Sequence, residues 1–205
     1  MSDTGVPPLS TPILCFNPAN RKKNKLHSIQ TKIEKTVDLD VFPKEILGES
    51  QAQYDAVVNA LLVLTKHHNF CKGILDEYIE TALTESDAIL VVEDYKKNKK
   101  RIVGMCVISF KKDHLYVDLI CSNQKVKGVG SLLLELVEVI SNTLSLEHMK
   151  LSSVTDAVPF YLKKKFECDK LCHMTRKVTK KRGVTLPGGV KKTKIRNTRR
   201  QLSSK

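Results

Sequence analysis

Apolar residues in the middle of the chain follow two different spacings, and each spacing predicts a type of element. Two runs rich in β-branched residues, 88–92 and 102–108, flank the polar stretch 95–100, which is typical of a hairpin between antiparallel strands. Apolar and polar side chains then alternate over 115–120, as expected for a third strand. The chain therefore predicts three neighbouring strands.

Apolar positions spaced three and four residues apart predict helices before and after these strands. The longest such stripe covers 129–146, and two shorter amphipathic segments, 54–65 and 74–83, are joined near Gly73. The remaining apolar runs predict a strand, a short helix and a last strand, over 149–154, 158–166 and 171–178. Two helices, a series of hairpin strands and then alternating helix and strand indicate an α/β fold with a mixed sheet.

A loop with two closely spaced glycines separates the third predicted strand from the long helix, and it reads Lys125-Val126-Lys127-Gly128-Val129-Gly130-Ser131. Glycine has no Cβ to keep an anion away, and a helix that starts here points its unpaired N–H groups at the same place. Lys125 and Lys127 add positive charge. The loop is a candidate phosphate site, and the alternative is that it only turns a strand into a helix.

Two common glycine-rich nucleotide motifs do not fit this loop. A P-loop requires a Gly-Lys pair followed by Ser or Thr, and no such pair follows Gly128. A dinucleotide-binding fingerprint requires a third glycine at position 133, where the chain has Leu133.

A second motif follows about thirty residues later, and it reads Ala157-Val158-Pro159-Phe160-Tyr161-Leu162-Lys163-Lys164-Lys165-Phe166. Together the two motifs resemble the GNAT family of acyl-CoA-dependent N-acetyltransferases, in which Arg/Gln-x-x-Gly-x-Gly/Ala opens a helix and Ala-x-x-Phe-Tyr-x-Lys-x-Gly-Phe follows a strand. The resemblance covers residues 88–178 well and extends weakly back to about residue 26. It implies a GNAT-like fold, which is a mixed, mostly antiparallel central sheet with helices on both faces.

The resemblance also implies where acetyl-CoA binds. The main chain of the glycine loop would hold the pyrophosphate, with Lys125 at a position where Arg or Gln is usual. The main chain around Ile120, which includes Cys121, would pair with the pantetheine arm. The family's glycine before the last Phe of the second motif is Lys165 here, so the chain departs from the family pattern at that turn.

Four side chains are candidates for moving protons, one as general acid and three as general base. The resemblance places Tyr161 where it can protonate the departing thiolate, and the alternative is an ordinary core aromatic. The glutamate that many relatives use as general base would fall on Leu115. Asp118 is the nearest carboxylate on that strand, either as general base or as a solvated or hairpin-paired aspartate, and Glu93 and Asp94 are further candidates. The base stays unassigned.

The net charge of +13 is concentrated at the C-terminal end. Residues 176–205 hold 12 of the 35 basic residues and no Asp or Glu, so the other 23 nearly balance the 22 acidic ones. We expect a flexible N-terminal extension over 1–25, one domain over 26–178 with a first strand within 26–41, and a disordered basic tail over 179–205. The tail is either a solubilising extension or an arm for nucleic acid or an import receptor.

Cysteine usage and the absence of long apolar stretches predict the redox state of the cysteines and the cell compartment. Three of the six cysteines, Cys71, Cys106 and Cys121, lie in or beside apolar runs and are expected to be reduced. The cluster Cys168-x-x-x-Cys172-His173 does not match paired zinc spacings, so no metal is expected. No signal sequence or apolar span is evident, which predicts an intracellular protein, cytoplasmic or nuclear, without a membrane partner.

Two functions are compatible with the sequence. The first is an N-acetyltransferase that transfers an acetyl group from acetyl-CoA to a primary amine of a protein, a polyamine or a small molecule. The alternative is a catalytically weak or inactive GNAT-fold protein that binds nucleic acid or a partner through its basic tail. The acceptor is undetermined, and which of four side chains faces it stays open: Asp76, Glu77, Tyr78 and Glu80.

Overall fold

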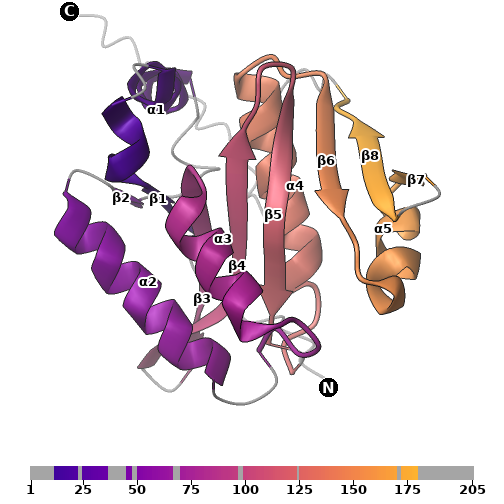
Figure 1. The fold of residues 1–205 in the computed structure, drawn as a ribbon, viewed down its shortest axis with the longest axis horizontal. Coiled ribbons are helices and arrows are strands. Elements are labelled where there is room, and N and C mark those ends of the chain that lie inside the picture. The colour runs from indigo at the N-terminus through magenta and orange to yellow at the C-terminus, as the bar shows by residue number, and fades with distance from the viewer. Residues whose placement is uncertain are drawn as a thin grey trace, which may run out of the picture.

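The computed structural model describes residues 12–22, 25–36, 45–47, 50–66, 70–96, 99–123, 125–169 and 172–179. Over these residues the strands form one sheet in the order β2-β1-β3-β4-β5-β6-β8-β7 (Figure 1). The strands are β1 Ile13–Phe16, β2 Glu45–Leu47, β3 Ala88–Lys96, β4 Lys99–Phe110, β5 His114–Ser122, β6 His148–Ser152, β7 Glu167–Cys168 and β8 His173–Lys177. The helices are α1 Lys25–Thr36, α2 Gln51–Lys66, α3 Asp76–Glu85, α4 Val129–Thr143 and α5 Val158–Lys163, with short 3-10 turns at Pro18–Lys22 and Thr155–Ala157.

The sheet is mixed and mostly antiparallel, because only the pairs β1–β2 and β5–β6 run parallel. Two apolar cores lie on its two faces. One contains Ile33 of α1 and the buried stripe of α4, and the other contains Tyr54 and Leu61 of α2 and Ile79 of α3. Figure 1 shows α2 and α3 in front of the sheet and α4 behind it. The predicted fold class is therefore confirmed, and so is the hairpin between β3 and β4.

The N-terminal part differs from the sequence prediction. A strand was expected within 26–41, but α1 occupies Lys25–Thr36, and the strand lies earlier, at Ile13–Phe16. This strand pairs with β3, and Leu14, Cys15 and Phe16 are fully buried. Pro12 and Pro18 stand just outside the strand, so neither removes a hydrogen-bond donor from the ladder. The sheet thus includes part of the predicted flexible extension, and residues 180–205 lie outside the described residues.

β5 contains a β-bulge opposite β4, at the level where its pairing with β6 ends. Val107 of β4 pairs with Leu119 and Ile108 pairs with Val117, so Asp118 is the extra residue. The parallel pairing of β5 with β6 ends at the same place, between Val117 and Leu151. Beyond it β5 continues without β6 beside it (Figure 1). The backbone edge of β5 is therefore not covered by β6 from the bulge to the glycine loop.

The turn after α5 explains the unusual lysine in the second motif. Lys165 has φ 65°, and the N–H groups of Lys165 and Phe166 donate to the carbonyls of Leu162 and Tyr161 at 3.0 and 3.1 Å. This is a Schellman motif, in which the residue after the C-cap adopts the left-handed conformation that glycine favours. The rings of Tyr161 and Phe166 pack edge to face with centroids 5.6 Å apart. The turn therefore forms without the glycine.

We expect Lys165→Gly to stabilise the protein. A left-handed non-glycine residue costs about 1–2 kcal/mol, and part of that gain is offset by the about 0.5–1 kcal/mol that glycine loses in chain entropy. The free energy of unfolding, measured by urea denaturation, should rise by about 0.5–1 kcal/mol.

The matched control is Lys163→Gly, which places glycine inside the last turn of α5 and should lower the free energy of unfolding. Equal destabilisation by both substitutions would contradict the Schellman assignment.

Candidate active site

The N-terminus of α4 is built to face an anion. The helix begins at Val129, and its N-cap residue, Gly128, has φ 87° and no side-chain capping bond. The first N–H groups of a helix have no intrahelical acceptor, and the helix dipole adds partial positive charge at the same end. A Cβ built on Gly128 meets no atom within 4 Å, so the space in front of the loop is open. This geometry suits a phosphate group.

A glycine on the neighbouring strand lets α4 lie close to the sheet. A Cβ on Gly104 of β4 would overlap Cγ1 of Val129 and would lie 3.2 Å from Cδ1 of Leu133. In the dinucleotide fingerprint a glycine on the helix permits this close approach. Here the small residue is on the strand instead, so Leu133 can be fully buried.

A cavity of about 450 Å³ extends from this loop along β5. It is lined by Cys71, Lys72, Ile74, Ile120, Cys121, Ser122, Val126, Lys127, Gly128, Val129, Gly130, Ser131, Val154, Ala157, Phe160 and Tyr161. The lining includes the residues predicted to bind acetyl-CoA except Lys125, whose N–H donates to Oδ1 of Asn123 at 3.0 Å. The sequence did not predict the contributions of the turn before α3 or of Val154, because only the tertiary fold brings them to β5.

A second cavity of about 370 Å³ adjoins the first on the α3 side of the gap between β5 and β6. Its lining is Gly73, Ile74, Leu75, Tyr78, Val117, Asp118, Leu119, Ile120, Leu151, Ser152, Ser153, Val154, Ala157 and Tyr161. The two cavities share residues at their junction, including Ile120 and Tyr161. Of the four side chains left open on α3, only Tyr78 lines this cavity.

Tyr161 is buried at the junction of the two cavities, with 5% of its surface exposed. Its ring packs edge to face on Phe160, with the centroids 5.1 Å apart. Burial raises the pKa of the Tyr161 hydroxyl, and the nearby thiol of Cys106 raises it further. The hydroxyl therefore keeps its proton at neutral pH and can act as a donor.

Asp118 is the one carboxylate among the described residues that lines either cavity. Its Oδ2 accepts hydrogen bonds from the hydroxyls of Ser109 and Ser86, at 2.7 and 3.0 Å. Burial raises the pKa of the Asp118 carboxyl, although the two hydroxyls act in the opposite direction. A raised pKa makes the carboxylate a better proton acceptor.

The other candidates for a base do not line these cavities. Leu115 is fully buried in the core on the α4 face, so no carboxylate stands at the position where the resemblance placed a general base. Asp94 pairs with Arg101 at 2.7 Å, and neither Asp94 nor Glu93 belongs to either lining.

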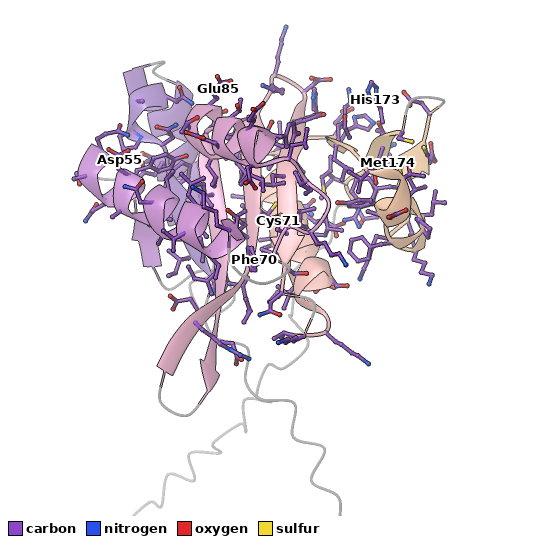
Figure 2. The ribbon with its side chains drawn as sticks, turned by 60° about the horizontal axis from the view of Figure 1, so that its bottom comes forward. Asp55, Phe70, Cys71, Glu85, His173 and Met174 are labelled. Atoms are coloured by element: carbon purple, nitrogen blue, oxygen red, sulfur yellow. A yellow bond between two sulfur atoms is a disulfide. The ribbon has the colours of Figure 1, made fainter. Side chains whose placement is uncertain are left out.

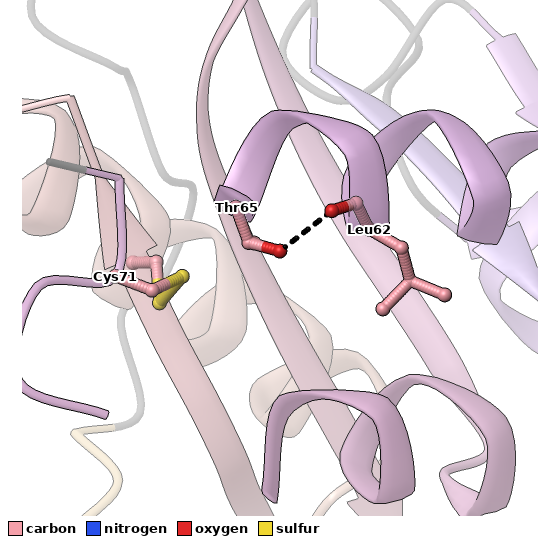
Figure 3. Close-up of a disulfide and its surroundings, with 4 residues drawn as sticks. Leu62, Thr65 and Cys71 are labelled. Carbon is pink, nitrogen blue, oxygen red and sulfur yellow. Dashed lines mark hydrogen bonds between the residues drawn. A yellow bond between two sulfur atoms is a disulfide. The ribbon is translucent and has the colours of Figure 1, made fainter. Parts of the chain in front are cut away.

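A disulfide joins Cys71 to Cys121 in the wall of the larger cavity. The prediction that these two cysteines are reduced was wrong. The turn after α2 carries Cys71 to β5, where the two Cα atoms lie 4.9 Å apart, and a sequence separation of 50 gives no sign of this contact. Figure 3 shows the bond near the end of α2, where Thr65 Oγ1 donates to the carbonyl of Leu62. Cys106 is free and buried, as expected.

No group of three or more His, Cys, Asp or Glu side chains in the described ranges could hold a metal ion. Among the helices described, none has the length and apolar character needed to cross a membrane.

The fold has counterparts among solved structures. A proposed N-acetyltransferase from Lactobacillus plantarum is 16% identical, with 63% of this chain and 94% of that chain covered and a TM-score of 0.48. The ribosomal-protein-S18-alanine N-acetyltransferase from Escherichia coli is 12% identical, with 60% and 89% covered and a TM-score of 0.47. Tetrahymena GCN5 is 12% identical, with 63% and 89% covered and a TM-score of 0.45. No family model and no curated protein sequence matches the chain.

We expect Gly104→Ala to displace the start of α4. The added methyl overlaps Val129, so the helix N-terminus must move away from β4, at a cost of about 1–3 kcal/mol. Thermal unfolding should show the loss of stability, and the affinity for coenzyme A should fall in the fraction that remains folded.

The control is Gly130→Ala, because a Cβ there lies 3.4 Å from the ring of Phe160 and meets no backbone atom within 4 Å. Alanine inside a helix also removes the entropy penalty of glycine. Loss of stability in Gly130→Ala but not in Gly104→Ala would contradict this account of the packing.

We expect Cys71→Ser to lower stability by up to about 4 kcal/mol, because the disulfide closes a loop of 50 residues in the unfolded chain. Urea denaturation without reductant measures the change. The control is Cys168→Ser, an exposed free cysteine whose replacement should have little effect. If reductant lowered the stability of Cys71→Ser as much as that of the parent protein, the assignment of the bond would fail.

Proposed function

We propose that this protein is an acyl-CoA-dependent N-acetyltransferase, which transfers an acetyl group from acetyl-CoA to a primary amine. One observation carries the proposal: two cavities meet beside the bulge of β5, and one of them leads to a helix N-terminus with a left-handed glycine. The larger cavity would receive the cosubstrate and the smaller one the acceptor. The acetyltransferases among the structural neighbours are in keeping with this proposal but do not carry it.

The residues present fit coenzyme A. A diphosphate would accept hydrogen bonds from the first N–H groups of α4, and the open space at Gly128 lets it approach the backbone. Lys127 and Lys72 line the same cavity and would add charge pairing. The edge of β5 past Asp118, where β6 no longer pairs, leaves backbone groups for the amides of the pantetheine arm.

The transfer needs few side chains because a thioester is already activated. Binding in adjoining cavities brings the amine to the thioester carbonyl, which makes the reaction effectively unimolecular. A backbone N–H of β5 near the bulge would stabilise the oxyanion. The carbon–nitrogen bond then forms, the carbon–sulfur bond breaks, and Tyr161 would give its proton to the thiolate.

The amine must lose a proton before or during this step, since an unperturbed lysine-like amine has a pKa of about 10.4. We propose Asp118 as the acceptor of that proton, because it lines the acceptor cavity and its pKa is raised by burial. Asn in its place would keep the shape but could not take up a proton.

The basic segment 179–205 has a separate proposed role. As predicted from its charge, it would act as an arm for nucleic acid or for an import receptor, in keeping with an intracellular location. Thr179 is its one described residue, and its hydroxyl donates to Oε1 of Glu138 at 2.6 Å. Thr179 therefore lies beside α4.

Calorimetry and a thiol-release assay test the proposed function together. Wild-type protein should bind acetyl-CoA and release free coenzyme A when a primary amine is added. Tyr161→Phe should bind acetyl-CoA within about twofold of wild type, since the ring packing is kept, while its kcat falls about 10²-fold or more through loss of the proton donor.

Full activity in Tyr161→Phe would remove this residue from the mechanism without affecting the binding proposal. Absence of binding heat with acetyl-CoA at millimolar concentration would overturn the enzymatic function. Binding without turnover of any amine would support the alternative of an inactive GNAT-fold protein, for which the buried Leu115 in place of a carboxylate is the favouring observation.

A further inference from the structure

The acceptor cavity is lined mainly by apolar groups, and its mouth is apolar too. Ile74, Leu119 and Leu151 are among the lining side chains. At the mouth, Leu75 is 77% exposed and Val154 is 52% exposed. Large apolar side chains that stay exposed around a hollow mark a binding surface.

Charge is scarce in this cavity. Asp118 is the carboxylate in its lining, and its Oδ2 already accepts two hydroxyl hydrogen bonds. The hydroxyl of Tyr78 donates to the backbone carbonyl of Asp118 at 2.8 Å, which occupies its proton. The acidic residues of α3 are exposed but do not belong to the lining: Asp76, Glu77, Glu80 and Glu85.

This arrangement disfavours two of the acceptor classes that the sequence left open, polyamines and basic peptides. A polyamine carries two or more ammonium groups, and a basic peptide several cationic side chains. Within the described residues the lining offers one carboxylate, so any second cation would meet apolar side chains and lose its hydration without compensation. A monoamine on an apolar body has no second cation to desolvate, and burial of its apolar body contributes favourably to the binding free energy.

We infer that the acceptor is a primary amine carried on a large uncharged apolar body, such as an arylalkylamine, and that Leu75 and Tyr78 select it at the mouth of the cavity. A volume of about 370 Å³ fits a small molecule of this type. The inference deepens the proposed function and rests on it for the reaction, whereas the preference in binding can be measured without any turnover.

Equilibrium binding to the full chain tests the inference. 2-Phenylethylamine, ethylamine and spermidine are titrated by calorimetry, each with and without desulfo-coenzyme A, which cannot react. We expect 2-phenylethylamine to bind at least tenfold more tightly than the other two. Ethylamine shares the amine but lacks the apolar body, so it isolates the contribution of that body.

A rim variant with a matched control ties the preference to this cavity. Leu75→Asp puts a charge at the mouth and should survive folding, because Leu75 is the N-cap residue of α3 and aspartate is a favoured N-cap. It should weaken 2-phenylethylamine at least threefold and strengthen spermidine. Leu162→Asp changes an exposed leucine of α5 that does not line the cavity, and it should alter neither affinity.

Each other result would overturn the inference. These results are tighter binding of spermidine or of a lysine-rich peptide, no binding of 2-phenylethylamine at millimolar concentration, or equal effects of the two leucine variants. In the same calorimeter, acetyl-CoA is titrated separately. Acetyl-CoA binding together with a preference for spermidine would refute this acceptor class and leave the acetyltransferase proposal standing, whereas failure of acetyl-CoA to bind would refute the reaction itself.

Discussion

One extra residue in β5 is the constraint on which the site depends. Because no residue of β4 pairs with Asp118 in the strand ladder, the register between β4 and β5 shifts there, and pairing with β6 stops at the same level. The side chains that follow, Leu119 and Cys121, belong to the core under α2 and α3, whereas Leu115 and Val117 belong to the core under α4. The bulge therefore frees a strand edge and also brings the α3 side of the sheet into contact with the site.

Most of the fold could be predicted from the sequence because its signals are local. Strand alternation over 115–120 and the helical stripe over 129–146 depend on near neighbours, and both elements form there. The N-terminal strand was missed, because a short run between two prolines gives little periodicity and becomes a strand only by pairing with β3. Its burial in the sheet decided its structure.

The residues of the candidate site also divide into those that the local sequence predicts and those that only the tertiary fold brings together. The glycine loop could be found because the required residues are consecutive, and all of it except Lys125 lines the cavity. The role of Gly104 could not be predicted from the sequence, because this residue acts by leaving room for Val129 of α4 beside β4. Leu75 was also hidden, and Tyr78 could not be separated from the acidic residues of α3, because the orientation of α3 on the sheet decides which of its side chains reach the smaller cavity.

The crosslink between Cys71 and Cys121 has a consequence for the environment in which the protein works. The bond fixes the turn after α2, in which Figure 2 labels Phe70 and Cys71, to β5 in the wall of the larger cavity. Reducing conditions would break this attachment, so that the wall of both cavities loses its covalent anchor. The thiol potential of the surroundings is thereby coupled to the shape of the two cavities.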